Sequence, residues 1–170
     1  MSAEIESLLA KQAITEQLCT YCRSVDRLDA ELFRSVYHSD ATIDYSVDQF
    51  RGRAADLADA FMEAHASAEC HTHGISNVLI KVVGDQAVSE TYAHAVLHFP
   101  ASDSTSPINR HYRGRYLDKW TKREGRWAIS HRQLVAEMSW EEEVSGGSFG
   151  ELSRRDRNDP VYELYSSISE

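Results

Sequence analysis

Two short turns between long runs of strand-forming residues constrain the fold of this chain most strongly. One turn is Gly84-Asp85 and the other is Glu124-Gly125. Tight turns of this composition join neighbouring antiparallel strands, so each turn predicts a long hairpin. We therefore expect a four-strand antiparallel meander with a polar loop between its two hairpins. The strands are predicted at His71–Val83, Ala87–Phe99, Ile108–Lys122 and Arg126–Met138, and the loop at Pro100–Pro107.

Apolar residues at helical spacing come before this sheet. From Ile5 to Val25 they recur on one face, which predicts a long first helix. Ser2 is placed to cap this helix, and Glu4 and Glu6 suit its positive end. Further elements are a helix at Asp29–Tyr37 with Asp29 as N-cap, a short strand at Ala41–Tyr45 and a helix at Arg53–Ser67.

Helices followed by a run of strands indicate an α+β fold. We expect a cone-shaped α+β barrel, in which the N-terminal helices pack on a strongly curved, mostly antiparallel sheet around a pocket. Residues 1–140 would form this domain, and residues 141–170 a C-terminal extension. The extension is polar but holds several apolar residues, so we expect it to pack on the domain, with the mouth of the pocket as a candidate position.

The composition excludes several classes of partner. The 170 residues suit one domain, and the net charge of −9 disfavours nucleic acid and anionic lipid, both of which need a basic surface. No apolar run approaches the length that spans a bilayer, and the N-terminus lacks the pattern of a signal peptide. The three cysteines, an odd number, then indicate reduced thiols in a cytoplasmic protein.

Two features carry residues suited to proton transfer or metal binding, and each also has a purely structural interpretation. Asp26 ends the first helix five residues after Tyr21, although Asp26 or Asp29 can instead simply cap the next helix. His71 and His73 share one strand face, but a metal site needs a third ligand that the spacing does not supply.

Two further patterns, a pair of cysteines and an arginine, also allow both a functional and a structural interpretation. Cys19 and Cys22 resemble half of a zinc site, yet they lie within a helix without a second pair, which favours buried structural thiols. Arg132 is predicted to share a strand face with Ala128, Ser130 and Leu134. It would line a pocket that holds an anion or a carbonyl, or else lie at an exposed strand edge.

The chain has no phosphate-binding loop, nucleotide fingerprint or serine nucleophile elbow. The remaining Asp, His, Tyr and Arg residues are those used for proton transfer and charge stabilisation. In order and spacing, the chain resembles the SnoaL-like, scytalone dehydratase-like branch of the nuclear transport factor 2-like superfamily. The resemblance runs from about Ala3 to Met138, and bile acid 7α-dehydratase and hexachlorocyclohexane dehydrochlorinase belong to the same branch. Its marks are Ala13-Ile14 through Tyr21 to Val25-Asp26, then His73 with Asn77 four residues on, then a Gly-x-Trp-x-Ile pattern that leads to Arg132.

The resemblance implies a role for each matching residue. His73 would be the general base, and Asp26 would orient its imidazole. Tyr21, Tyr45 and Arg132 would assist a leaving group or bind a carbonyl or carboxylate. The dehydrochlorinase has Lys where this chain has Tyr21, which disfavours chloride elimination. His94 or His98 would match a second catalytic histidine, and Asn77, His71 and His111 are further candidates for binding substrate.

The expected function is therefore that of a lyase without metal or organic cofactor, which eliminates water from a hydrophobic, oxygenated aromatic or polycyclic compound. Three alternatives stay open: a carbon–carbon lyase that acts by retro-aldol deformylation, a non-catalytic binding or scaffold domain, and a ketosteroid-isomerase-like enzyme. Relatives in this branch also imply a homo-oligomer, either a trimer or a dimer.

Overall fold

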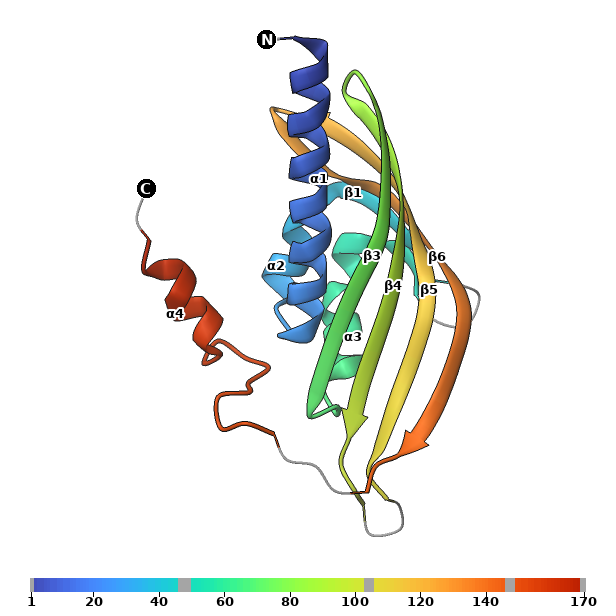
Figure 1. The fold of residues 1–170 in the computed structure, drawn as a ribbon, viewed down its shortest axis with the longest axis vertical. Helices are drawn as coiled ribbons and strands as arrows, with labels where there is room; N and C mark the ends of the chain where they lie inside the picture. The colour runs from blue at the N-terminus through green and yellow to red at the C-terminus, as the bar shows by residue number, and fades with distance from the viewer. Residues whose placement is uncertain (1, 46–49, 103–105, 146–148, 169–170) are drawn as a thin grey trace.

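The computed structural model describes residues 2–45, 50–102, 106–145 and 149–168. Three helices lie on the concave face of a curved sheet, and a fourth, short helix lies outside them (Figure 1). The predicted α+β architecture is confirmed. In chain order the elements are α1 (Ala3–Asp26), α2 (Ala30–Ser35), β1 (Tyr37–Asp44), β2 (Arg51–Arg53), α3 (Ala54–His65), β3 (Cys70–Val83), β4 (Gln86–Phe99), β5 (Ile108–Arg123), β6 (Arg126–Glu143) and α4 (Pro160–Ser166).

The sheet has six strands in the order β2-β1-β6-β5-β4-β3. The predicted meander forms its larger part, β3 to β6, and all neighbours within it are antiparallel. Beyond the prediction, β1 adds to β6 in parallel and β2 adds to β1, so the sheet is mixed. The sheet is strongly curved but stays open, because its edge strands β2 and β3 do not pair with each other.

The helix α1 begins where its sequence signals place it. The Ser2 hydroxyl accepts a hydrogen bond from the backbone N–H of Ile5, and the first turn carries two glutamates. Its buried side chains face β3 and the interior, where they meet the core residues of the sheet. At the other end, Asp29 caps α2 by accepting from the N–H of Leu32, as predicted. The buried side of α1 comprises Ala10, Ile14, Leu18, Tyr21, Cys22, Ser24 and Val25.

A β-bulge at Ser130 decides which side chains of β6 point inward. The two residues that flank Ser130, Ile129 and His131, pair with consecutive residues of β5. Consecutive strand residues point to opposite faces, so Ile129 and His131 do as well, and Arg132 returns to the interior face of Ile129. The prediction that Arg132 shares a face with Ala128 and Ser130 is therefore wrong, because plain alternation ignores the bulge.

The described residues after β6 run along the side of the helices that faces away from the sheet (Figure 1). Arg27 forms an ion pair of 2.9 Å with Asp159, and the Tyr162 hydroxyl donates to the carboxylate of Asp29 at 2.9 Å. The described part of the extension is thus anchored at the turn between α1 and α2. None of the described helices is long and apolar enough to cross a bilayer.

Candidate active site

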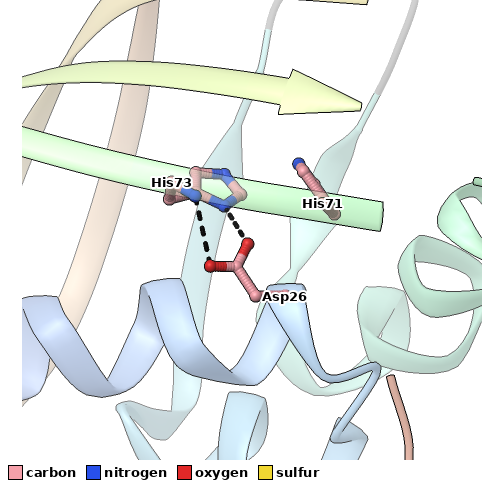
Figure 2. Close-up of side chains that lie close together, drawn as sticks. All are labelled: Asp26, His71 and His73. Carbon is pink, nitrogen blue, oxygen red and sulfur yellow. Dashed lines mark hydrogen bonds and ion pairs between the residues drawn. The ribbon is translucent and has the colours of Figure 1, made fainter. Parts of the chain in front are cut away.

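The side chains of Asp26 and His73 meet at the C-terminal end of α1, where β3 passes beside it (Figure 2). The Nδ1 atom of His73 lies 2.7 Å from one carboxylate oxygen of Asp26. The backbone N–H of His73 donates to the other oxygen at 3.1 Å. The side chain of His73 is 5% exposed and that of Asp26 is 15% exposed, so this hydrogen-bonded pair is largely shielded from water.

The two contacts determine which nitrogen of His73 carries the proton. A carboxylate accepts hydrogen bonds and does not donate them, so Nδ1 is the protonated nitrogen. In the neutral ring Nε2 then carries the lone pair. No hydrogen bond to Nε2 is formed within the described residues. His73 lines the pocket and can take a proton there through Nε2.

His71 presents a second imidazole to the same pocket. It is 2% exposed, and neither ring nitrogen has a hydrogen-bond partner among the described residues. Its ring stacks on that of His65 with the planes 4° apart and lies 4.5 Å from the ring of His73. Burial lowers the pKa of His71 far below its usual value, so the ring is neutral at physiological pH. It therefore offers one donor and one acceptor to a bound molecule.

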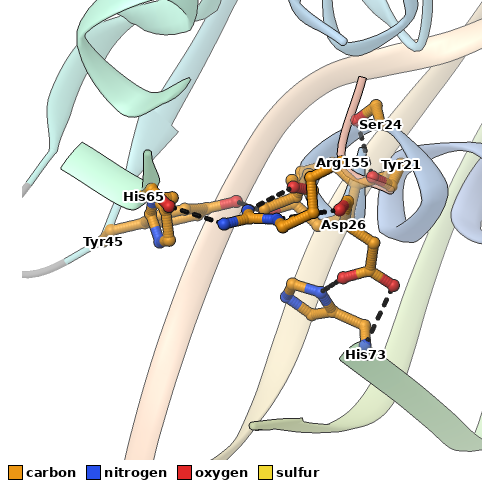
Figure 3. A network of polar contacts seen from close by, with 8 residues as sticks. Tyr21, Ser24, Asp26, Tyr45, His65, His73 and Arg155 are labelled. Atoms are coloured by element: carbon orange, nitrogen blue, oxygen red, sulfur yellow. Dashed lines mark hydrogen bonds and ion pairs between the residues drawn. The ribbon is translucent and has the colours of Figure 1, made fainter. Parts of the chain in front are cut away.

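Tyrosine hydroxyls form the inner end of the site. The hydroxyls of Tyr21 and Tyr45 lie 2.7 Å apart, and both residues line the pocket together with Tyr116 (Figure 3). Burial raises the pKa of Tyr21 and of Tyr116 well above the usual value, and raises that of Tyr45 too. These phenols stay protonated and can donate hydrogen bonds to an oxygen of a substrate.

Arg132 lies behind this tyrosine wall. Its guanidinium donates two hydrogen bonds to Asp118, at 2.7 and 2.8 Å, and both side chains are fully buried. Burial alone would lower the pKa of Arg132, but Asp118 and the surrounding tyrosines hold it well above its usual value. The guanidinium carbon also lies 4.1 Å from the ring centre of Tyr21 and 4.2 Å from that of Tyr116. Arg132 thus supports the two rings, and it is not part of the pocket surface.

The pocket between the sheet and the helices has a volume of about 650 Å³. This space is large enough for a molecule of a few fused rings, and its walls combine apolar and polar groups. Apolar side chains of Phe50, Phe61, Ala93, Ala95, Leu97 and Leu134 line it alongside the histidines and tyrosines described above.

Four predicted binding residues lie outside this pocket. Ala93, Ala95 and Leu97 of β4 line it, so alternation along the strand places His94 and His98 on the opposite face of the sheet. His111 is on that outer face too, where it stacks on Trp140 and His94. Asn77 is exposed in a β-bulge of β3 with a φ of 48°. We therefore remove these four residues from the candidate site.

Several pocket residues were not predicted as site residues, among them Tyr116, His65 and Phe61. Tyr116 lies two residues before Asp118 on the inner face of β5, and strand alternation is the signal that could have found it. Phe61 and His65 lie one helical turn apart on α3, where the His65 ring donates to the carbonyl oxygen of Phe61 at 2.6 Å. Helical spacing could have placed both side chains on one face of this helix.

The structure supplies the third metal ligand that the spacing of the two histidines lacked. Asp26, His71 and His73 present ligand atoms within 4.8 Å of one another. Two imidazoles and a carboxylate are a donor set that suits transition metals. Each oxygen of Asp26 accepts one hydrogen bond from His73 and keeps a further lone pair. A metal bound to Nε2 of His73 would, however, occupy the nitrogen that a general base needs, so His73 cannot serve both uses at once.

Similar proteins share this fold. The Kfla4162 protein from Kribbella flavida has a TM-score of 0.71 at 18% identity, over 79% of this chain and 95% of that one. A scytalone dehydratase candidate from Novosphingobium aromaticivorans has a TM-score of 0.69 at 20% identity, over 82% of this chain and 91% of that one. A hexachlorocyclohexane dehydrochlorinase from Novosphingobium barchaimii also has a TM-score of 0.69, at 15% identity over 87% of this chain and 99% of that one.

No curated protein matches the chain at a significant level. The family model of the SnoaL-like domain, in contrast, matches residues 6–133, which is most of the chain and all of α1 to β5 except the first residues of α1. The protein therefore belongs to the SnoaL-like domain family, within the nuclear transport factor 2-like superfamily.

Proposed function

We propose that this protein is a cofactor-independent lyase that eliminates water from a hydrophobic, oxygenated ring compound. The observation that carries the proposal is the hydrogen bond of 2.7 Å between Asp26 and His73, with Nε2 of His73 left for the pocket. This arrangement is that of a general base whose tautomer is held by a carboxylate. Scytalone dehydratase and dehydrochlorinase folds among the structural neighbours are consistent with elimination chemistry.

In the proposed reaction, Nε2 of His73 removes a proton from a carbon next to the leaving group. Asp26 stabilises the imidazolium that forms, since its carboxylate keeps the Nδ1 proton bound. The electrons of the broken C–H bond form a double bond, and the C–O bond to the departing hydroxyl breaks. A phenol of Tyr21 or Tyr45 donates a hydrogen bond to the departing oxygen, which takes the proton held by the His73 imidazolium and leaves as water.

The pocket walls support the proposed class of substrate. Phenylalanine, leucine and alanine side chains suit a flat apolar ring system. The unpartnered nitrogens of the buried His71 favour a substrate that also carries an oxygen, because an imidazole left without a partner there would be costly.

The same base would serve a retro-aldol deformylation, in which it removes a hydroxyl proton and an aldehyde leaves. An isomerase of the ketosteroid type is less well supported, because it needs a carboxylate base in the pocket. Both oxygens of Asp26 face His73, and Glu137, the carboxylate on the pocket wall, is paired with Arg115 at 2.7 Å. A scaffold domain has no need for the buried pair.

The test is a turnover screen of hydroxylated aromatic and polycyclic compounds with the wild type and two variants. His73→Ala removes the base, and His98→Ala removes a histidine of the outer sheet face as a matched control. We expect the wild type and the control to eliminate water from the substrate at similar rates. The turnover rate of His73→Ala should be lower by at least ~10²-fold, as for loss of a general base. Release of an aldehyde would instead identify the carbon–carbon lyase. Equal turnover by His73→Ala would exclude His73 as the base.

A further inference from the structure

One side chain of the C-terminal extension reaches into the region of the catalytic pair. The Arg155 guanidinium donates to the backbone carbonyl oxygens of Asp26 at 3.1 Å and of Val25 at 3.3 Å (Figure 3). Its Nη1 group donates to the carbonyl oxygens of His65 at 2.7 Å and of Ala68 at 2.6 Å. One planar group thus binds four carbonyl oxygens from two separate stretches of the chain.

These carbonyls are of the kind that a cation stabilises. The last carbonyls of a helix lack partners within the helix and carry a partial negative charge. Val25 and Asp26 end α1, and His65 ends α3. Only arginine has a planar fork of five N–H groups that can serve several such acceptors at once.

The same carbonyls belong to segments that carry the site. Asp26 is itself the residue that holds the ring of His73. His65 stacks on His71, and Ala68 comes two residues before β3, the strand that carries His71 and His73. Arg155 therefore connects the end of α1, the end of α3 and the start of β3 at one point.

We propose that Arg155 is a positioning residue that holds the Asp26–His73 pair in its productive geometry. This inference rests on the proposed function, in which the pair is the base. Arg155 is not among the residues that line the pocket, and it acts through the backbone of the helix ends. Arg155 lies beyond residues 6–133, the part of the chain that the SnoaL-like model matches.

The rest of the extension keeps Arg155 in place. Arg157 forms ion pairs of 3.2 Å with Asp29 and with Glu31. Arg27 pairs with Asp159, which also caps α4. The extension is thus fixed to the α1–α2 turn a few residues after Arg155, which allows a short segment to deliver its guanidinium to the helix ends.

The test compares Arg155→Met with Arg154→Met. Both replace an arginine of the extension, but the exposed Arg154 donates only to the carbonyl oxygen of the adjacent Ser153 among the described residues. We expect kcat to fall ~10- to 100-fold in Arg155→Met with KM changed less than about threefold, because a misplacement of the base near 1 Å costs about this much. Arg154→Met should match the wild type in both constants.

A second readout needs no substrate. The Nδ1–H proton of His73, identified in the NMR spectrum by its absence from His73→Ala, should exchange slowly in the wild type and faster in Arg155→Met. If this proton depends on Arg155 but no compound is turned over, Arg155 positions the pair and the lyase proposal fails alone. If Arg155→Met keeps both the protected proton and the wild-type kcat, Arg155 does not position the pair.

Arg155→Lys covers the case in which Arg155→Met does not fold. A lysine ammonium retains the charge but has three donors on a single atom, so it cannot span all four carbonyls. We expect it to fold and to show an intermediate loss of kcat and of proton protection. Reduced stability with an unchanged kcat and an unchanged His73 proton in the folded Lys variant would mean that Arg155 has only a structural role.

Discussion

Replacing Asp26 with Asn tests the central geometry, because it keeps the size of the side chain and changes only its hydrogen-bonding groups. In the wild type, His73 directs two N–H donors at the carboxylate, one from Nδ1 and one from its backbone. An asparagine offers one acceptor and one donor group in their place. The backbone N–H cannot change, so the amide oxygen must face it. The amide NH₂ then faces Nδ1, which must give up its proton, and Nε2 becomes the protonated nitrogen.

The cost of this change can be worked from the two contacts. To act as a base, the variant ring must return its proton to Nδ1. It then loses a hydrogen bond to a charged acceptor, about 1.5–3 kcal/mol, and leaves a buried donor without an acceptor, about 1–3 kcal/mol. Together these come to about 2.5–6 kcal/mol, which at about 1.4 kcal/mol for each factor of ten lowers kcat roughly 10²- to 10⁴-fold.

Two measurements check this prediction for Asp26→Asn. Nitrogen-15 NMR of the labelled histidines reports which nitrogen of His73 is protonated, and it requires no substrate. Turnover of the best compound from the screen reports kcat. Asp59→Asn, which changes an exposed aspartate that pairs with Arg34, is the matched control and should resemble the wild type in both. Retention of the Nδ1–H form, together with a kcat within about threefold of the wild type, would refute the reasoning.

Three further predictions follow from the pocket and its support. Tyr21→Phe should lower kcat ~10²-fold, because this phenol would assist the leaving group, whereas Tyr92→Phe, which changes an exposed tyrosine of β4 outside the pocket, should change kcat little. Steady-state kinetics compares the two variants. Asp118→Asn should lower the free energy of unfolding, measured in urea, by about 3–5 kcal/mol, because it leaves the guanidinium of Arg132 buried without its charge partner. A loss below about 1 kcal/mol would contradict this prediction. His71 is neutral when folded because burial lowers its pKa, so the unfolded chain binds an extra proton below about pH 6.5. The contribution of His71 to the free energy of unfolding should therefore be fully present above that pH and fall by up to about 1.4 kcal/mol per pH unit below it. Urea unfolding at pH 7, 6 and 5 should show a smaller fall in the free energy of unfolding for His71→Phe than for the wild type.

The parts of the fold that depend on local pattern could be predicted from the sequence. Ser2 and Asp29 cap the first two helices as expected, since a cap acts on residues two or three positions away. The two tight turns likewise place the hairpins of the meander. The parallel pairing of β1 with β6 was not predicted, because it joins segments that lie about ninety residues apart and leaves no local signature.

Side-chain direction in the strands was harder to predict than the strands themselves. Alternation divides β4 into two faces but does not say which face is inside, so His94 and His98 were assigned to the pocket when they belong to the outer face. Bulges change the direction within a strand, as Ser130 does for Arg132. Arg155 was missed for a different reason: it binds backbone carbonyls, which every residue has, so no residue pattern marks its partners.

The interior beside the pocket is more polar than stability alone would favour. A buried ion pair such as that of Arg132 and Asp118 is often no more stable than apolar residues of the same size. It persists here against the rings of Tyr21 and Tyr116, and Tyr21 in turn holds the hydroxyl of Tyr45. A domain that served only as a scaffold could fill this space with aliphatic side chains. The ion pair instead contacts the rings of phenols that face the same cavity as His73. This supports the proposal that the cavity carries out proton-transfer chemistry.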